Sequence, residues 1–276
     1  MERLKRISLK TASFILLTIL ALLVIVPLAW MALSAFKEEK EILSFPPTFF
    51  THSFTLKNFA NTAKRIKIIK YIANSVIYAG VTTALAVVVN SMAGYAYARK
   101  KFKGKGIFFI TTLATMMIPF QVIMVPTFLV VYKLGMYNTY WGLIIPRVAV
   151  PGSIFLMRAA FAGLPVELED AARIDGLSEW GIFWRIMLPQ VRSSAICLII
   201  LSINGSWNDL LWPMIVASDT SMRTLSNGLA LFVGQNSIQY GASFAGALIS
   251  IAPMFVLYIF GQKYFVEGMA SSGLKG

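Results

Sequence analysis

Six long apolar runs divide this chain of 276 residues, and they limit its fold more than any other feature. A helix needs roughly 20 apolar residues to cross a bilayer, and each run reaches that length. Since 57% of the residues are hydrophobic and only 13% are charged, the chain is too apolar for a soluble domain. We therefore predict an all-α membrane protein with one transmembrane domain over residues 1–276. The six predicted transmembrane helices lie at about 12–36, 71–98, 107–131, 139–161, 192–216 and 242–265.

Several classes of function are excluded by what the chain contains. The formal net charge of +13 does not indicate nucleic-acid binding, because the basic residues lie between the apolar runs. One cysteine, Cys197, and one histidine, His52, exclude a disulfide framework and a His/Cys metal cluster. Asp209 has no second carboxylate or histidine within the predicted spans, which argues against an intramembrane enzyme. No phosphate-binding glycine loop followed by Lys-Ser/Thr is present, so we expect no ATP hydrolysis, catalytic residue, metal or cofactor in this chain.

The distribution of Lys and Arg predicts how the spans are oriented, because cytoplasmic loops carry an excess of positive charge. The N-terminal tail has four basic residues over 3–10, and the loop over 99–105 has five. We therefore place both termini in the cytoplasm, with the first run as an uncleaved span, since it is too long for a signal peptide. The basic loop over 37–70 disagrees with this orientation, but its Phe45-Pro46-Pro47-Thr48 segment favours an ordered external loop.

A polar segment over residues 164–190, called the acidic loop below, separates the fourth and fifth predicted spans. Pro165 favours the first turn of a helix, and Gly176 is placed to end that helix in a left-handed conformation. Ser178 is a suitable N-cap for a second short helix, which we expect to stop at Pro189. The orientation above makes the loop cytoplasmic, where it is either a solvated helix-turn-helix or a docking surface for a soluble partner. Its acidic residues outnumber its basic ones: Glu167, Glu169, Asp170, Asp175 and Glu179 against Arg173 and Arg185.

The acidic loop resembles the loop signature of the inner-membrane permease subunits of binding-protein-dependent ABC importers. In that family Glu-Ala-Ala is followed after three residues by Gly, and after nine more by Ile-x-Leu-Pro. This chain has Asp170-Ala171-Ala172, Gly176 and Ile186-x-Leu188-Pro189 at those positions. Asp170 replaces the usual Glu, which keeps the charge and shortens the side chain by one methylene.

Further segments, along essentially the whole chain, resemble the carbohydrate-importing branch of this family and the subunits similar to the maltose permease G protein. Their order and consistent spacing make the resemblance strong. The matching segments are Phe45-Pro46-Pro47-Thr48, Met117-Ile118-Pro119-x-Gln121-Val122 with Pro126, Leu134-Gly135-x-x-Asn138-Thr139, Trp207-Asn208-Asp209-x-Leu211-Trp212-Pro213, Arg223-Thr224-Leu225 with Gly228-Leu229, Tyr264-Phe265-Val266-Glu267-Gly268 and Gly273-x-Lys275-Gly276.

The resemblance implies a permease subunit of an ATP-driven importer in the inner membrane, for a carbohydrate or a related polyol or glycerol-phosphate. The implied partners are a second permease in a heterodimer, two copies of an ATPase that binds ATP and Mg²⁺, an external solute-binding protein and membrane lipid, but no nucleic acid. ATPase closure would push the acidic loop and alternate access to the pathway. The residues implied for ATPase coupling are Glu169, Asp170, Ala171, Ala172, Asp175 and Gly176, and those implied for an ATPase-contacting tail are Gly273, Lys275 and Gly276.

The alternative function is a secondary transporter or channel that works without ATP. Such a protein typically carries an internal inverted repeat and has no need of a long acidic cytoplasmic loop. The chain has that loop and no clear repeat, which favours the importer. The sequence does not identify the solute.

Polar residues within the predicted spans indicate either a solute path or hydrogen bonds between helices. Asn204 and Asn208 share one helix face, and Pro213 cannot donate to the carbonyl of Asp209, so we expect a kink there. Arg147 and Asp209 lie about eight and seven residues from the outer ends of their spans, so we expect them to form an ion pair. The residues of the possible translocation path are Gln121, Asn204, Trp207, Asn208 and Asp209.

Overall fold

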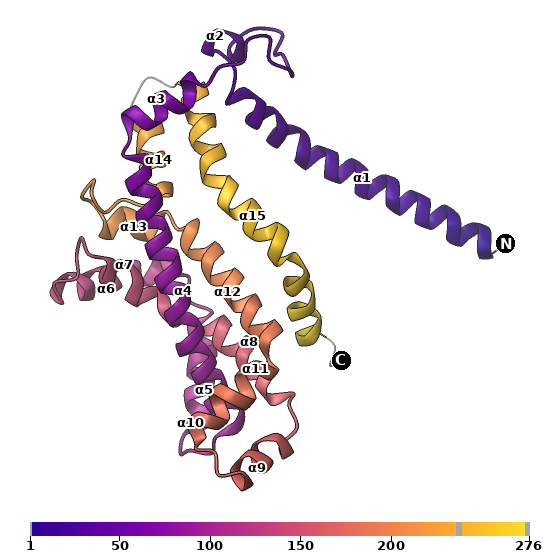
Figure 1. Cartoon of the computed structure of the whole chain (residues 1–276), viewed down its shortest axis with the longest axis vertical. Coiled ribbons are helices and arrows are strands. Elements are labelled where there is room, and N and C mark those ends of the chain that lie inside the picture. The colour runs from indigo at the N-terminus through magenta and orange to yellow at the C-terminus, as the bar shows by residue number, and fades with distance from the viewer. Residues whose placement is uncertain (1, 236–238, 274–276) are drawn as a thin grey trace. The chain divides into compact units, whose positions relative to one another are not determined.

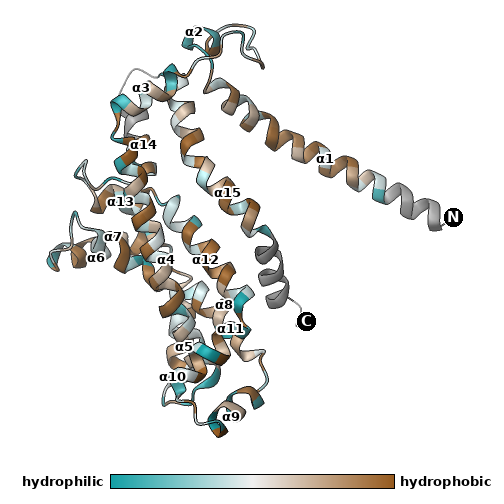
Figure 2. Ribbon diagram, viewed as in Figure 1, coloured by the Kyte–Doolittle hydropathy of each residue, from teal (hydrophilic) through white to brown (hydrophobic). Residues whose placement is uncertain are grey.

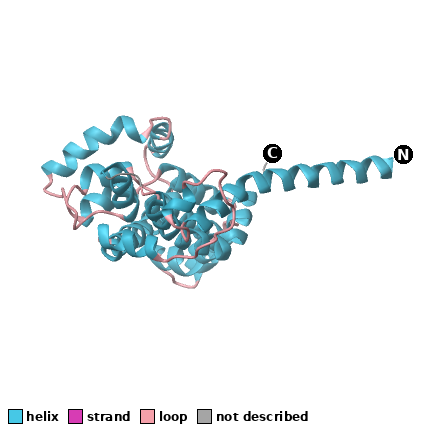
Figure 3. Cartoon of the chain, turned by 90° about the horizontal axis from the view of Figure 1, so that it is seen from above, coloured by secondary structure: helices cyan, strands magenta, loops and turns pink. Residues whose placement is uncertain are grey.

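The computed structural model describes residues 2–235 and 239–273, and within them the chain forms helices and loops with no strand (Figure 3). Helix makes up 76% of the structure, which confirms the predicted all-α class. The helices, all labelled in Figure 1 except the π-helix, are α1 (Glu2–Ser34), α2 (Glu39–Ile42), α3 (Lys57–Arg65), α4 (Ile68–Arg99), α5 (Lys105–Thr115), α6 (Phe120–Lys133), α7 (Tyr140–Val148), α8 (Pro151–Ala162), α9 (Glu167–Ile174), α10 (Glu179–Gly181), a π-helix (Ile182–Met187), α11 (Leu188–Gln190), α12 (Arg192–Trp207), α13 (Leu211–Val216), α14 (Leu225–Gln235) and α15 (Tyr240–Gly273).

The chain divides into two compact units, each built from two stretches of sequence. The first unit contains Met1–Ile68 and Leu229–Ala252, and the second contains Ile69–Gly228 and Pro253–Gly276. The acidic loop and most of the polar residues singled out above belong to the second unit. The single domain over residues 1–276 stays a prediction.

Three of the predicted spans, the first, second and sixth, form unbroken helices that are long and apolar enough to cross a membrane. Figure 2 shows the apolar character of α1 along most of its coloured length. The helical segments that meet the length and hydropathy requirements are Lys10–Ser34 within α1, Ile68–Arg99 (α4) and Tyr240–Gln262 within α15.

The other three predicted spans are not single straight helices. The third is α5 and α6, bent by 106°, and the fourth is α7 and α8, bent by 46°. In the fifth, α12 is bent by 84° from the helical segment Glu179–Gln190 that precedes it, and it ends at Trp207 rather than near residue 216. If each bent pair counts as one span, the total is six, as predicted.

Proline lies at the breaks of the third and fourth spans and at a second interruption in the fifth. Pro119 lies between α5 and α6, and Pro151 occupies the first turn of α8. Val150, directly before Pro151, has an extended backbone, because the residue before a proline disfavours the helical conformation, and Ala149 before it is extended as well. In the fifth span Pro213 has no N–H for the carbonyl of Asp209, and the predicted interruption is confirmed between α12 and α13.

A buried amide from α4 satisfies the backbone at the break in the fourth span. The Nδ2 of Asn90 donates to the carbonyl of Val148 at 2.9 Å, and its Oδ1 accepts from the N–H of Val150 at 2.9 Å. The same Nδ2 donates to the carbonyl of Ala86 within α4 at 2.7 Å. Unpaired peptide groups are costly in lipid, so this fully buried side chain makes the bend compatible with a membrane.

Carboxylates organise the loop between α1 and α3 in the first unit, which confirms that this segment is ordered. Glu39 accepts the N–H groups of Tyr240 and Gly241 at 2.8 and 3.0 Å and thereby caps α15. Glu41 accepts hydrogen bonds of 2.9–3.3 Å from the N–H of His52 and the hydroxyls of Thr48, Thr51 and Ser53. These bonds, above all that from His52, lower the pKa of the Glu41 carboxyl.

Two apolar cores stabilise the second unit. One surrounds Trp212, which is fully buried and donates from its indole N–H to the carbonyls of Gly142 and Leu143 at 3.2 Å. The other includes Phe161 of α8 and Phe183 of the acidic loop. This second core packs the acidic loop against the ends of the transmembrane helices.

Candidate functional site

The first half of the acidic loop folds much as its sequence predicts. Helix α9 begins at Glu167, two residues after Pro165, and has three acidic residues in its first turn, where the helix dipole favours them. Gly176 follows with φ +78°, the left-handed conformation that only glycine adopts cheaply. The N–H of Gly176 donates to the carbonyl of Arg173 at 3.0 Å, which closes the C-terminus of α9.

The second half is a helix over residues 179–190 that contains a π-helical turn. The hydroxyl of Ser178 accepts the N–H of Gly181 at 3.3 Å, so the predicted N-cap is confirmed. The π-helix over Ile182–Met187 precedes Pro189, which has no N–H for the carbonyl of Arg185. The helix does not stop at Pro189 as predicted, since α11 extends to Gln190 before the bend into α12.

Glu169 attaches α9 to the end of the second span. Its side chain is only 5% exposed, and its Oε2 accepts from Nε of Arg99 at 2.6 Å. Its Oε1 accepts from the hydroxyl of Tyr95 at 2.5 Å. Burial opposes the charged form of the carboxyl, but the bonds from Tyr95 and Arg99 and the charges of Arg99 and Lys100 outweigh it and lower the pKa of Glu169.

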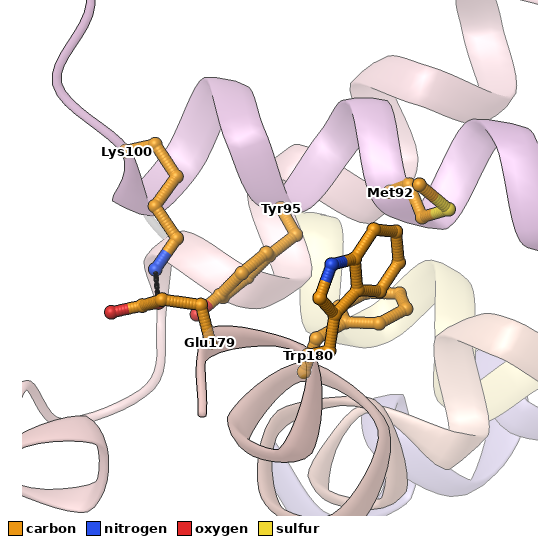
Figure 4. Close-up of a pocket in the computed structure, with 6 residues that line it drawn as sticks. Met92, Tyr95, Lys100, Glu179 and Trp180 are labelled. Atoms are coloured by element: carbon orange, nitrogen blue, oxygen red, sulfur yellow. Dashed lines mark hydrogen bonds and ion pairs between the residues drawn. The ribbon is translucent and has the colours of Figure 1, made fainter. Parts of the chain in front are cut away.

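Lys100 binds the second helix of the acidic loop through Glu179 (Figure 4). Burial lowers the pKa of the Lys100 ammonium, but hydrogen bonds to Glu179 and Tyr95 and their charges raise it above its ordinary value. Trp180, beside this ion pair, is 62% exposed. A cavity of about 160 Å³ lies here, lined by Met92, Tyr95, Lys100, Glu179, Trp180 and Phe183.

The residues implied for ATPase coupling divide into an inner and an outer set. Glu169 and Ala172 are buried, and they hold the loop to the rest of the second unit. The outer set carries two acidic groups and two small residues, an arrangement that would let another protein approach the backbone closely. The exposed members are Asp170, Ala171, Asp175 and Gly176.

A second polar cluster lies where the broken spans meet, and it confirms the predicted ion pair. Nη2 and Nε of Arg147 lie 2.5 and 2.8 Å from Oδ2 of Asp209. The hydroxyl of Tyr78 on α4 donates to the same oxygen at 3.0 Å, and Oδ1 of Asp209 accepts the N–H of Trp212 at 3.3 Å. The sequence does not predict the role of Tyr78, since nothing in an apolar run distinguishes a tyrosine that bonds a buried carboxylate from any other tyrosine.

Of the residues of the possible translocation path, some are exposed and others are buried. Gln121, Asn204 and Asn208 are exposed, and Nδ2 of Asn208 donates to Oδ1 of Asn204 at 2.9 Å on their shared helix face. Trp207 is only 5% exposed and Asp209 only 8%, so neither presents much surface to a solute within this chain.

The implied ATPase-contacting tail is described only at its start. Gly273 is the last residue of α15, while Lys275 and Gly276 lie outside the described residues. Among the residues that the structure describes, no group of three His, Cys, Asp or Glu side chains could hold a metal ion.

Residues 86–270 match the family of binding-protein-dependent transport system inner membrane components. The chain belongs to this family. The family predicted from the acidic loop is therefore confirmed, and with it the assignment of the chain as a membrane transport component.

Individual relatives match over nearly their whole length. The arabinooligosaccharides transport system permease protein AraQ of Halalkalibacterium halodurans is 38% identical over 260 residues, 93% of each chain. The lactose transport system permease protein LacG of Rhizobium radiobacter is 32% identical over 93% of each chain. The trehalose/maltose transport system permease protein MalG of Thermococcus litoralis is 31% identical over 100% of this chain and 99% of that protein.

The fold is also similar to one of known structure. A chain of a bacterial ABC transporter involved in the import of the acidic polysaccharide alginate superposes with a TM-score of 0.83 over 93% of this chain and 96% of that chain. Since the two sequences are 21% identical, the likeness concerns the fold alone.

Proposed function

We propose that this chain is the permease subunit of an ATP-driven importer and transmits the work of partner ATPases through its acidic loop. The observation that carries the proposal is the folded helix α9, which is attached to the second span by a buried carboxylate and exposes Asp170 and Ala171, with Asp175 and Gly176 exposed directly after it. A loop that is only solvated has no need of a buried charge pair, whose desolvation is expensive.

The proposed solute is an oligosaccharide, within the wider class of carbohydrates, polyols and glycerol-phosphates. The relatives that support this choice are named for arabinooligosaccharides, lactose, diacetylchitobiose and trehalose/maltose. Sugars bind through hydrogen bonds, and the exposed amides of Gln121, Asn204 and Asn208 offer donors and acceptors within the spans.

The proposed assembly is a heterodimer with a second permease, joined by two copies of an ATPase that bind ATP and Mg²⁺, and served by an external solute-binding protein. Exposed amides within a span are costly against lipid, so they support a second permease that faces them across the path. Both termini and the acidic loop lie in the cytoplasm in this proposal, because the basic tail and the loop over 99–105 favour that side.

A mild-detergent pull-down of the tagged chain from its native membrane, with partners identified by mass spectrometry, tests this proposal. We expect to recover a second permease and an ATPase, and the recovered complex in proteoliposomes should take up oligosaccharide only with ATP and the binding protein. A chain recovered alone that moves solute without ATP would instead identify a secondary transporter or channel.

A further inference from the structure

We propose that Glu169 is a positioning residue that makes the acidic loop move together with the second span, α4, when a partner ATPase displaces the loop. The inference rests on the proposed function and adds the route by which the displacement enters the membrane. It assigns Glu169 to a contact within this chain rather than to the surface that meets the ATPase.

Arg99 is the centre of this attachment because it is the last residue of α4 and uses all three side-chain nitrogens on the acidic loop. Nε binds Glu169 at 2.6 Å, while Nη1 and Nη2 donate to the carbonyls of Leu164 and Pro165, each at 3.1 Å. The side chains of Arg99 and Glu169 are only 8% and 5% exposed. The planar guanidinium therefore fixes both the entry of the loop and the first turn of α9.

Tyr95, one turn earlier on α4, occupies the other oxygen of Glu169 and extends the contact into the apolar core. Its hydroxyl lies 2.5 Å from Oε1, and Nζ of Lys100 lies 3.6 Å from the same oxygen. The Tyr95 ring packs against Phe161 and Phe183, with centroids 5.3 Å away in both cases. Phe161 lies in α8, before α9, and Phe183 lies in the π-helix, after α9. Tyr95 therefore contacts the chain on both sides of α9 as well as Glu169 within it.

The remaining ion pairs of the loop are more exposed and contribute less to this attachment. Glu179 is 56% exposed where it meets Lys100 and Arg173, and Asp170 is 61% exposed where it meets Arg173. Exposed pairs are screened by water and salt and are readily exchanged for hydration. Glu169 is thus the carboxylate of the loop whose separation from its partner is most costly.

Helix α4 can carry a displacement onward because it is unbroken for 32 residues and contacts two of the broken spans. Its Asn90 bonds both sides of the break in the fourth span, and its Tyr78 bonds Asp209 in the interruption between α12 and α13. Glu169 and both interruptions are therefore connected through α4 by the hydrogen bonds of Tyr95, Asn90 and Tyr78, which gives a movement of the loop a physical route to them.

The first experiment compares Glu169→Gln with Glu179→Gln in the complete complex in proteoliposomes. Both substitutions remove one loop carboxylate and keep the side-chain length, but only the first removes a buried one. We expect Glu169→Gln to co-purify with the ATPase and to hydrolyse ATP normally, while solute taken up per ATP falls about tenfold or more. Glu179→Gln should keep that ratio within about twofold.

Three results would overturn the inference. Glu169→Gln could take up as much solute per ATP as the wild type. It could instead lose the ATPase from an otherwise assembled complex, which would make Glu169 part of the docking surface. An equal loss in Glu179→Gln would indicate a general effect of loop charge. If the wild-type complex moves solute without ATP, the proposed function itself fails, so the two failures are distinguishable.

A cross-link keeps the inference testable if Glu169→Gln does not assemble. Arg99→Cys and Glu169→Cys are combined in a Cys197→Ala background and joined by a short bifunctional thiol reagent in the purified complex. Since the loop and α4 are proposed to move together, the cross-linked complex should take up at least as much solute as the unlinked one. Loss of uptake on cross-linking would show that the two must separate during the cycle.

Discussion

The guanidinium of Arg147 and the carboxylate of Asp209 form an ion pair at the interruptions of two spans, with Nη2 only 2.5 Å from Oδ2. Arg147 precedes the break at Ala149 and Val150 by two residues, and Asp209 lies within the break between α12 and α13. The same guanidinium lies 4.1 Å from the ring centroid of Phe120, the first residue of α6 after the break in the third span. One arginine therefore lies beside the break between α7 and α8 and contacts residues at two others, Phe120 after the break between α5 and α6 and Asp209 in the interruption between α12 and α13.

Removing either partner of this pair should destabilise the complex, because it leaves a charge without its counterion. For Arg147→Ala and Asp209→Ala we expect a loss of about 3–5 kcal/mol each, and clearly less assembled complex in detergent. Size-exclusion chromatography and thermal unfolding measure both effects. The double variant should recover part of the loss, and assembly no better than in the single variants would contradict a functional pairing.

Asn90→Leu should destabilise the second unit without any direct effect on solute contacts. It leaves the carbonyl of Val148 and the N–H of Val150 unpaired, at a cost of about 1–3 kcal/mol for each buried group. Thermal unfolding of the purified chain measures this. Asn204→Leu makes the same chemical change at an exposed position and should alter the midpoint little; equal losses in the two variants would contradict the role of Asn90.

Gly176→Val should uncouple transport from ATP hydrolysis, and Gly135→Val is its matched control. Both glycines have positive φ, +78° and +70°, and a Cβ at either would meet nothing within 4 Å in this chain. Each valine therefore costs a similar backbone strain, about 1–2 kcal/mol or more. Only the valine at 176 lies on the exposed part of the acidic loop, so uptake per ATP should fall there alone. An equal fall in both variants would indicate strain rather than docking.

The attachment of the acidic loop should weaken as the pH falls into the acid range. The pKa of Glu169 is lowered from 4.5 in the folded chain, so its ion pair contributes stability above that value and loses it as the pH falls through the folded pKa. Hydrogen exchange of residues 164–179 between pH 7 and pH 3 measures the attachment. We expect protection to persist down to pH 4.5 and to fall below it. A loss of protection already near pH 6 would contradict the assignment.

Local rules predicted the acidic loop well because its signals are short-range. Gly176 and Ser178 take up the predicted turn and N-cap, and the shared depth of Arg147 and Asp209 was enough to predict their contact. The resemblance implies the same coupling role for Glu169 as for Asp170 and Asp175, since charge alone does not reveal that Glu169 is buried. The five basic residues at 99–105 predict only the orientation of the spans, whereas two of them, Arg99 and Lys100 at the end of α4, bind the loop.

The breaks within the third and fourth spans are not predicted by hydropathy. Hydropathy averages over about 20 residues, and neither Pro119 nor Pro151 lowers that average enough to divide a run. The pairs Ile118-Pro119 and Val150-Pro151 were the available signals, because the residue before a proline resists the helical conformation. Whether such a break survives in a membrane depends on a partner elsewhere in the chain, as Asn90 is for the fourth span, and a local pattern cannot supply that information.

Asn90 also imposes an order on the biogenesis of the protein. The carbonyl of Val148 and the N–H of Val150 find their partner in Asn90 on α4, which is synthesised more than fifty residues earlier. The fourth span cannot adopt its bent form at low cost in lipid until it has met the second, because two backbone groups would otherwise lie in hydrocarbon unpaired. The bent form of the fourth span therefore requires its association with the second span, whose Asn90 supplies the partner of both groups.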